Sequence, residues 1–258
     1  DLVEWQLRIA FGEALPLQQD QLRINGHAFE ARVYAEDPDN DFLPATGTIE
    51  FLQTPATNQH IRIDTGIRQG DEVSVYYDPM IAKVITWGED RASALNQMAR
   101  ALNQYRLVGT KTNLNLLQDL VAHPAFQAED IDTGFIEKHR ESLFSAADAQ
   151  QLNEAMAIAA SYKILRQQQQ ANTTQDSNSP WLQSDAWAGI DNGYWPLVFA
   201  SGEDQYKLAV TVNGPLQTIR IKDEELKLSA KLIDSNNLSV TINNTEHEVT
   251  VVEINNQY

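Results

Sequence analysis

GHAFEARVYAEDP, residues 26–38, alternates between apolar and polar side chains and therefore predicts a β-strand whose two faces differ. The apolar face comprises Phe29, Ala31, Val33 and Ala35. The opposite face carries Glu30, Arg32 and Tyr34. This second face has two interpretations at this point. It is either an ordinary solvated surface or an anion-binding wall, because a guanidinium is an always-charged fork that suits carboxylate-like groups.

The composition describes an acidic globular protein. The chain has 258 residues, a hydrophobic fraction of 42% and a formal net charge of −17. This charge disfavours non-specific binding to nucleic acid or to an anionic membrane, so we expect neither as a partner. No apolar run approaches the roughly 20 residues of a membrane-spanning helix. The chain has no cysteine, which excludes disulfides and thiol nucleophiles and fits a reducing compartment.

The first part of the chain, residues 1–144, is predicted to be a strand-rich domain with helices packed on it. A short amphipathic helix over 2–11 precedes the quoted strand. Two further amphipathic helices are expected, one capped by Asp90 and one that opens at Thr112. Additional short strands, separated by glycines and turn residues, are expected at 47–53, 61–64, 72–77 and 80–87.

The second part, residues 145–258, is predicted to hold a long helix followed by an antiparallel β-meander or barrel. The helix is expected near 147–168, and the polar segment 167–179 is interpreted as a linker. Four or five alternating strands follow, with Asn213-Gly214 and Asn243-Asn244 as tight turns. A lone sheet would leave one apolar face wet, so the meander is expected to wrap the helix. The predicted class of the whole chain is therefore α+β.

Several kinds of site are absent from the sequence. It contains no glycine-rich phosphate loop and no Gly-x-Ser-x-Gly elbow. Its five histidines show no i,i+4 pairing with a glutamate, so no metal site is predicted in this segment. Asp78, which Pro79 holds extended, has two interpretations. Its carboxylate either caps a turn between strands or is held against a cation, for which Arg32 is the obvious candidate.

Five motifs in the same order resemble the C-terminal subdomain of biotin carboxylase. They are GHAFEARVYAEDP with FLP at 42–44, DTG at 64–66, YYDPMIAK at 76–83, GTKTN at 109–113 and FIE at 135–137. The opening DLVEWQLRIA, residues 1–10, resembles the helix that follows this family's main catalytic motif. The resemblance covers residues 1–144. The remainder, 145–258, is similar, more loosely, to the domain that docks the biotin-containing (alpha) subunit of an acyl-CoA carboxylase onto its carboxyltransferase (beta) subunit.

Among these carboxylases, YYDPMIAK followed by WGEDR at 87–91 most resembles the biotin-containing subunit for 3-methylcrotonyl-CoA, an enzyme of leucine catabolism. The subunits for propionyl-CoA and geranyl-CoA are alternatives. A competing interpretation is a non-catalytic module that only docks other subunits.

The resemblance implies a ligase reaction in which ATP and bicarbonate give carboxyphosphate, whose breakdown delivers CO2 to N1 of biotin. Arg32 matches the catalytic arginine that holds bicarbonate and stabilises the charge on the ureido oxygen of biotin. Asp78 and Glu30 are expected to position Arg32. Thr133 is expected near the adenine of ATP, and Arg62 matches an arginine of the dimer interface.

The resemblance also implies cofactors and partners outside this segment. They are ATP with Mg2+ or Mn2+, biotin on a carrier domain of the same chain, the carboxyltransferase subunit, and a second copy in a biotin carboxylase homodimer. The family's ATP-grasp domain would precede Asp1 and its biotinylation motif would follow Tyr258, so we expect this segment alone not to turn over ATP. The expected compartment is the bacterial cytoplasm, or the mitochondrial matrix for a eukaryotic protein.

Overall fold

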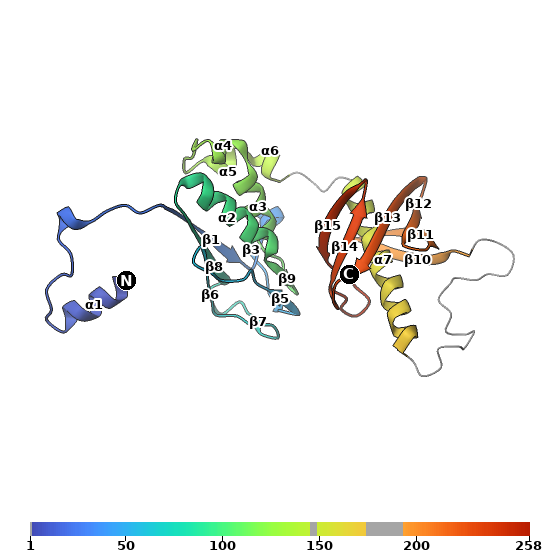
Figure 1. Cartoon of the computed structure of the whole chain (residues 1–258), viewed down its shortest axis with the longest axis horizontal. Helices are drawn as coiled ribbons and strands as arrows, with labels where there is room; N and C mark the ends of the chain where they lie inside the picture. The colour runs from blue at the N-terminus through green and yellow to red at the C-terminus, as the bar shows by residue number, and fades with distance from the viewer. Residues whose placement is uncertain (1, 145–148, 174–192) are drawn as a thin grey trace. The chain divides into compact units, whose positions relative to one another are not determined.

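The computed structural model describes residues 2–144, 149–173 and 193–258. The chain divides into two compact units, Asp1–Leu143 and Phe144–Tyr258 (Figure 1). Each unit has its own hydrophobic core. The predicted α+β class is confirmed, because both units combine helices with antiparallel sheets.

A three-stranded antiparallel sheet forms the centre of the first unit (Figure 1). Its strands are, in spatial order, β1 (His27–Tyr34), β8 (Met80–Gly88) and β6 (Ile61–Thr65). β1 is the strand predicted from residues 26–38, and its burial alternates as predicted. Ala31 and Val33 are buried, whereas Arg32 between them is exposed. The sheet therefore has one apolar face in the core and one polar face in solvent.

Two helices cover the apolar side of this sheet. α2 (Arg91–Gln104) packs on β8 and β1, and α3 (Leu114–Ala122) packs on α2. The predicted cap of α2 is confirmed, because Oδ1 of Asp90 accepts a hydrogen bond from the backbone N–H of Ser93 at 2.7 Å. Met98 of α2 is fully buried in the same core as Val33.

Short elements complete the first unit. α1 (Leu2–Ala10) confirms the predicted N-terminal helix, and none of its side chains is buried. The others, in chain order, are η1 (Gln19–Gln21), β2 (Glu36–Asp37), η2 (Pro38–Asn40), β3 (Leu43–Pro44), β4 (Gly47–Thr48), β5 (Phe51–Gln53), β7 (Glu72–Val73), β9 (Arg106–Val108), α4 (Pro124–Gln127), α5 (Phe135–Lys138) and α6 (Arg140–Leu143).

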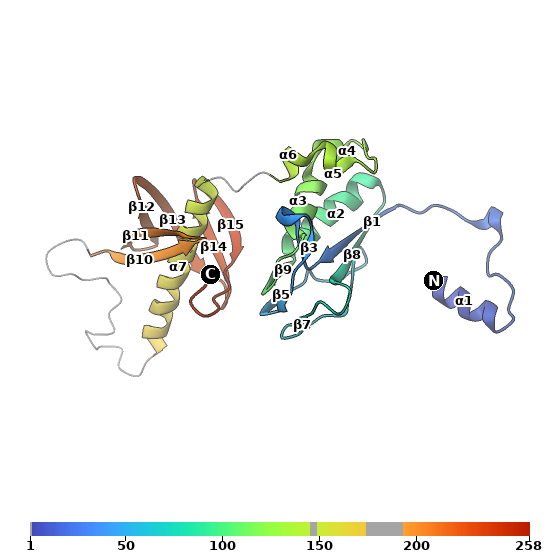
Figure 2. The same cartoon turned by 180° about the vertical axis from the view of Figure 1, so that it is seen from behind.

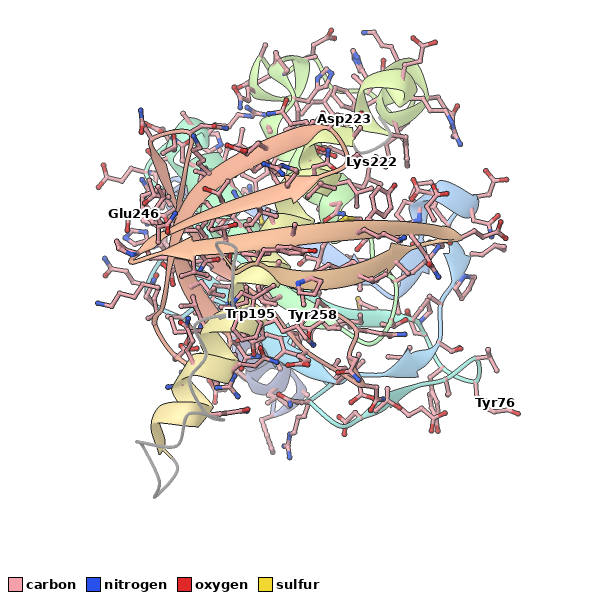
Figure 3. The ribbon with its side chains drawn as sticks, turned by 90° about the vertical axis from the view of Figure 1, so that its right-hand side faces the viewer. Tyr76, Trp195, Lys222, Asp223, Glu246 and Tyr258 are labelled. Carbon is pink, nitrogen blue, oxygen red and sulfur yellow. The ribbon has the colours of Figure 1, made fainter. Side chains whose placement is uncertain are left out.

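The strand expected at 72–77 is shorter than predicted. Its paired part, β7, ends at Val73, and Tyr76 and Tyr77 lie in an exposed loop. Figure 3 shows Tyr76 at the outer edge of the unit, where its side chain is 88% exposed. Tyrosine favours β-strands, but no neighbouring strand among the described residues pairs with Tyr76 and Tyr77, so they do not form one.

Two glycines of the quoted motifs occupy positions that a larger residue does not fit. Gly26, just before β1, has a φ of +68°, and a Cβ there would overlap the carbonyl oxygen of Gly88. Gly109 has a φ of +123°, and a Cβ there would overlap the carbonyl oxygen of Thr48. The positive φ and the lack of space for a Cβ both favour glycine at these two positions.

The second unit consists of α7 (Ala149–Thr173) and a six-stranded antiparallel sheet whose strands are neighbours in chain order. Figure 2 shows α7 lying against this sheet, and Ala160 and Ile164 of α7 are fully buried in a core shared with Val210 and Val240. The predicted meander against a helix is thus confirmed. The strands are β10 (Trp195–Ser201), β11 (Asp204–Asn213), β12 (Leu216–Ile221), β13 (Glu224–Leu232), β14 (Asn237–Ile242) and β15 (Thr245–Thr250).

The turns of the meander follow the sequence. Asn243 and Asn244 both have positive φ, 51° and 62°, as a two-residue hairpin turn requires. Gly214 has a φ of +62° between β11 and β12. The predicted turn at Asn243-Asn244 is therefore confirmed. The predicted hairpin between β11 and β12 also forms, but its two loop residues are Gly214 and Pro215, because Asn213 pairs with Leu216 in the sheet.

Two details of the second unit correct the sequence prediction. α7 extends to Thr173, so residues 167–173 of the predicted linker are helical, because glutamine and alanine are good helix formers. Residues 174–179 of that segment lie outside the described residues. The sheet has six strands instead of four or five, since β10 and β13 were not predicted. Pro196 obscured β10, which lies at the edge of the sheet, where proline is tolerated.

Candidate functional site

The exposed face of β1 presents the guanidinium of Arg32 to solvent. Its side chain is 59% exposed, and its Nε donates a hydrogen bond to Oε1 of Glu30 at 3.0 Å. This bond, together with one to Tyr34, raises the pKa of Arg32, which is charged at any physiological pH. The predicted pair of Glu30 and Arg32 is therefore brought together, and Glu30 fixes one edge of the guanidinium.

Three further charged side chains lie on the same face of the sheet. In the antiparallel register, Arg32 of β1 lies opposite Lys83 of β8, and Lys83 lies opposite Asp64 of β6. Residues opposite each other in such a pair project to the same face. Asp64 accepts hydrogen bonds from Nε and Nη2 of Arg62 at 2.8 and 3.0 Å, and hydrogen bonding from Arg62 is the main reason that the pKa of Asp64 is lowered. Arg62, predicted at a dimer interface, is 73% exposed on this face.

Asp78 is not paired with Arg32. Its Oδ1 accepts a hydrogen bond from the backbone N–H of Met80 at 2.9 Å, which makes it a turn cap just before β8. The turn is joined to the end of β1 by a bond of 2.8 Å from the N–H of Ala35 to the carbonyl of Pro79. The structure therefore supports the first interpretation of Asp78, in which its carboxylate caps a turn between strands. Such a bond to a backbone N–H two residues further on is a common local contact of aspartate.

Asn113 is the positioning residue that the sequence did not identify. Its side chain Oδ1 accepts from the N–H of Tyr34 at 2.9 Å, and its Nδ2 donates to the carbonyl of Arg32 at 3.1 Å. Its own N–H donates to the carbonyl of Tyr34 at 3.2 Å. Asn113 is only 8% exposed. Through these bonds it takes the place of a neighbouring strand at the free edge of β1 and holds the backbone that directly follows the Arg32 side chain.

Thr133 lies apart from these charged rows, in the exposed turn that precedes α5. Arg91 anchors the segment before this turn. Its guanidinium donates to the carbonyls of Gln127 and Phe126 at 2.9 and 2.7 Å and lies over the ring of Phe29, 5.3 Å from the centroid. Because Phe29 belongs to β1, Arg91 connects the strand of Arg32 with the segment that leads to Thr133.

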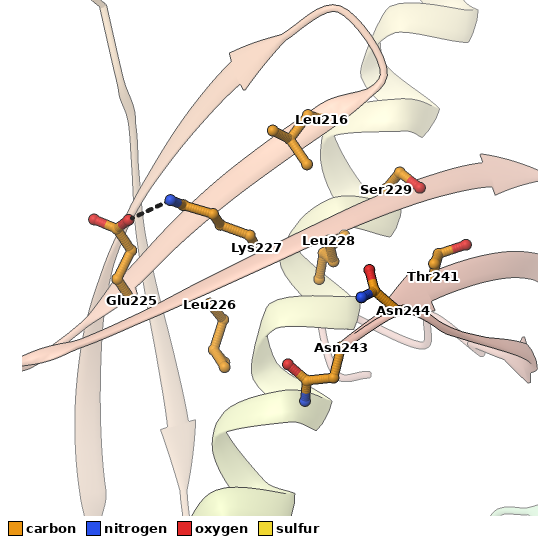
Figure 4. A pocket seen from close by; sticks show the side chains of 9 residues that line it. All are labelled: Leu216, Glu225, Leu226, Lys227, Leu228, Ser229, Thr241, Asn243 and Asn244. Atoms are coloured by element: carbon orange, nitrogen blue, oxygen red, sulfur yellow. Dashed lines mark ion pairs between the residues drawn. The ribbon is translucent and has the colours of Figure 1, made fainter.

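Two hollows of the surface lie away from Arg32. One, of about 560 Å3, is formed in the second unit by β12, β13 and β14, and its lining includes Leu216, Lys227 and Asn243 (Figure 4). Another, of about 580 Å3, lies in the first unit beside Lys111, whose ammonium pairs with Asp37. Arg32 lines neither of them. The candidate site is therefore the open charged face of the sheet.

The described residues contain neither a metal-binding cluster nor a membrane-spanning helix. No group of three or more histidine, aspartate or glutamate side chains in 2–144, 149–173 and 193–258 is arranged to hold a metal ion. Likewise, no helix of the described part of the chain has the length and apolar character to cross a bilayer.

The first unit matches a known family. Residues 30–138 match the model of the biotin carboxylase C-terminal domain. The biotin carboxylase domain dimer of Hydrogenobacter thermophilus 2-oxoglutarate carboxylase, solved with MgADP, ADP and bicarbonate, is similar with a TM-score of 0.55 and 37% identity. The match covers 57% of this chain and 32% of that one. A biotin carboxylase subunit of pyruvate carboxylase has the same TM-score at 38% identity, covering 57% of this chain and 32% of its own.

Curated relatives extend the match into the second unit. The mitochondrial methylcrotonoyl-CoA carboxylase subunit alpha of Dictyostelium discoideum is 50% identical over 181 residues, which are 70% of this chain and 26% of that protein. Its counterpart in Mus musculus is 43% identical over 217 residues, which are 83% of this chain and 30% of that protein.

The first unit is therefore a biotin carboxylase C-terminal domain, which confirms the predicted family. Within this family the chain is homologous to the alpha subunits of methylcrotonoyl-CoA carboxylase, as its motifs predicted. It spans 26 to 30% of the length of these two relatives.

Proposed function

We propose that this chain is part of the biotin carboxylase component of an acyl-CoA carboxylase, and that Arg32 is its catalytic residue. The observation that supports this most directly is the geometry of Arg32. It lies within the matched segment 30–138, is exposed, and is oriented by Glu30. The reaction is the ATP- and bicarbonate-dependent carboxylation of biotin. It is a property of a protein longer than this chain, since the match covers only 26 to 30% of these two relatives.

The chemistry asked of Arg32 suits a guanidinium. Glu30 engages Nε, so the carboxylate does not occupy the two terminal nitrogens. These nitrogens can present parallel N–H donors to bicarbonate, or to an oxygen on which negative charge develops. Biotin, when bound, supplies the ureido nitrogen that accepts CO2. Removal of a donor aimed at a developing oxyanion lowers turnover by about 10² to 10³-fold.

The nucleotide site is proposed to lie mainly outside this chain. Its ligands are ATP and Mg2+ or Mn2+, and the similarity to a structure with MgADP and bicarbonate supports this proposal. In this chain, Thr133 is the residue proposed near the adenine. Its place in an exposed turn leaves it accessible to a ligand.

The second unit is proposed to dock the carboxyltransferase (beta) subunit. The designation of the relatives as alpha subunits supports such a partner. The other proposed partners are the biotin carrier domain of the same chain and a second copy that meets this one at Arg62. The dimer of the Hydrogenobacter thermophilus domain supports the last of these.

The acyl-CoA is proposed to be 3-methylcrotonyl-CoA, an intermediate of leucine catabolism, on the basis of the names of the most similar relatives cited above. A propionyl-CoA carboxylase alpha chain from Caenorhabditis elegans is 44% identical over 137 residues, which keeps propionyl-CoA as the second candidate. The proposed compartment is the bacterial cytoplasm, or the mitochondrial matrix if the protein is eukaryotic, as in the named relatives.

Incorporation of labelled bicarbonate by the full-length protein tests this function. We expect incorporation that requires both ATP and biotin, and that is passed to 3-methylcrotonyl-CoA when the carboxyltransferase subunit is added. No ATP-dependent incorporation would overturn the proposed reaction. Transfer to propionyl-CoA alone would leave the reaction in place and replace the acyl substrate.

A further inference from the structure

Lys83 lies opposite Arg32 on the central strand of the sheet. Directly opposed residues of an antiparallel pair have their Cβ atoms about 4.5 to 5.5 Å apart. The two side chains project to the same face, so a guanidinium and an ammonium share one row. Like charges in this arrangement destabilise a sheet unless an anion compensates for them.

The carboxylates nearby do not fully compensate for these cations. The rows formed by Glu30, Arg32, Arg62, Asp64 and Lys83 contain three positive and two negative side chains. Both oxygens of Asp64 already accept bonds from Arg62. Glu30 is engaged by Arg32. The face therefore carries a local positive excess on a chain whose formal net charge is −17.

Asp64 holds the ammonium of Lys83 by a single long contact. The Nζ of Lys83 lies 3.6 Å from Oδ2 of Asp64, which is an ion-pair distance and longer than an ordinary hydrogen bond. Its side chain is 35% exposed, less than the 59% of Arg32. The contact with Asp64 engages at most one of the three N–H donors of this partly buried ammonium, so the others can bind an anion that approaches from solvent.

We propose that Lys83 is a second contact for the bicarbonate that Arg32 binds, and this inference rests on the proposed function. Bicarbonate is small and has oxygens on several sides. The planar fork of Arg32 addresses one edge of such an anion, and the ammonium of Lys83 supplies a point charge to another oxygen. Asp64 holds Lys83 in this row and engages at most one of its three donors.

The test compares variants of the full-length protein. Lys83→Met removes the charge and keeps most of the aliphatic stem, and Lys83→Arg keeps the charge. Lys227→Met is the matched control, because Lys227 has a similar ion pair, 3.5 Å from Glu225, on a strand of the second unit. We expect Lys83→Met to raise the KM for bicarbonate about tenfold or more, with the KM for ATP unchanged. Lys83→Arg should restore most of this loss, and Lys227→Met should have no effect.

Asp64→Asn separates this role from a structural one. If Lys83 serves only to pair with Asp64, then Asp64→Asn and Lys83→Met should lower the Tm alike and leave the KM for bicarbonate unchanged, which would overturn the proposal. Binding of bicarbonate should also raise the Tm of the wild type, and this increase should be lost in Lys83→Met. A wild type with no biotin-dependent activity would instead refute the proposed function. A change in the KM for biotin alone would refute bicarbonate as the anion.

Discussion

Replacement of Asn113 by alanine should loosen the strand that carries Arg32. The variant loses the bonds to the N–H of Tyr34 and the carbonyl of Arg32, which are 79 and 81 residues away in the chain. Each lost bond leaves a partly buried backbone group without its partner, at about 1 to 3 kcal/mol. The two bonds share one side chain and are not additive, so we expect a loss of about 2 to 4 kcal/mol in the free energy of unfolding.

Urea unfolding of the chain measures this loss, and Asn115→Ala is the matched control. Asn115 lies two residues further on, on the exposed side of α3, so the same chemical change should shift stability by less than about 0.5 kcal/mol. In the full-length protein, Asn113→Ala should also lower the rate of biotin-dependent ATP cleavage, because the backbone of Arg32 is less firmly held.

Asn113→Asp tests the reasoning most severely. Asn113 is the residue before α3, where aspartate is as good a helix cap as asparagine, yet its side chain makes no cap bond. Aspartate keeps an acceptor for Tyr34 but turns a carboxylate oxygen toward the carbonyl of Arg32. We therefore expect Asn113→Asp to be as damaging as Asn113→Ala. A neutral Asn113→Asp, or an Asn113→Ala no worse than Asn115→Ala, would refute the role assigned to this residue.

Three further predictions concern the fold and the second unit. Gly109→Ala should lower the free energy of unfolding in urea by at least about 2 kcal/mol. Gly70→Ala is the control, because Gly70 also has a positive φ but has open space around it, and it should lose less. Equal losses in the two variants would contradict the overlap with Thr48. Asp90→Ala should lower the urea midpoint at pH 7, whereas Asp90→Asn should not. The bonds from Ser93 lower the pKa of Asp90 in the folded state, so the stability that Asp90 contributes over alanine is largest above the usual carboxyl range. This difference should decrease as the pH falls below that range, and a difference that does not change with pH would contradict this cause. Deletion of 145–258 from the full-length protein should release the carboxyltransferase subunit in size-exclusion chromatography, and continued co-elution would argue against the docking role.

The local patterns of the sequence predicted the strand and its two faces. The alternation in residues 26–38 places Arg32 on the exposed side of β1, as the structure has it. Asparagine and glycine pairs predicted the hairpin turns, because their backbone preferences are local. Polar composition was a weaker guide, since the glutamine-rich part of the predicted linker continues α7.

Local sequence patterns could not predict the contacts between residues that are far apart in the chain. No periodicity shows that Asn113 reaches back to Arg32 and Tyr34, and only the register of β1 and β8 places Lys83 opposite Arg32. For Asp78 the sequence allowed two interpretations, a turn cap or a partner of a cation. The bond from the backbone N–H of Met80 shows that it is a turn cap. A motif thus identified the candidate residue, and the sheet register identified its neighbours.

The central claim is that Arg32 acts on the substrates of biotin carboxylation, and its most direct test is biotin-dependent ATP cleavage by the full-length Arg32→Ala variant. Arg220→Ala is the control, since Arg220 has a comparable exposure of 66% and an ion pair of 3.4 Å with Glu225. We predict a loss of about 10² to 10³-fold in turnover for Arg32→Ala, with the mass of the assembly unchanged and with Arg220→Ala fully active. Wild-type turnover in Arg32→Ala, or a loss that merely accompanies disassembly, would contradict the claim.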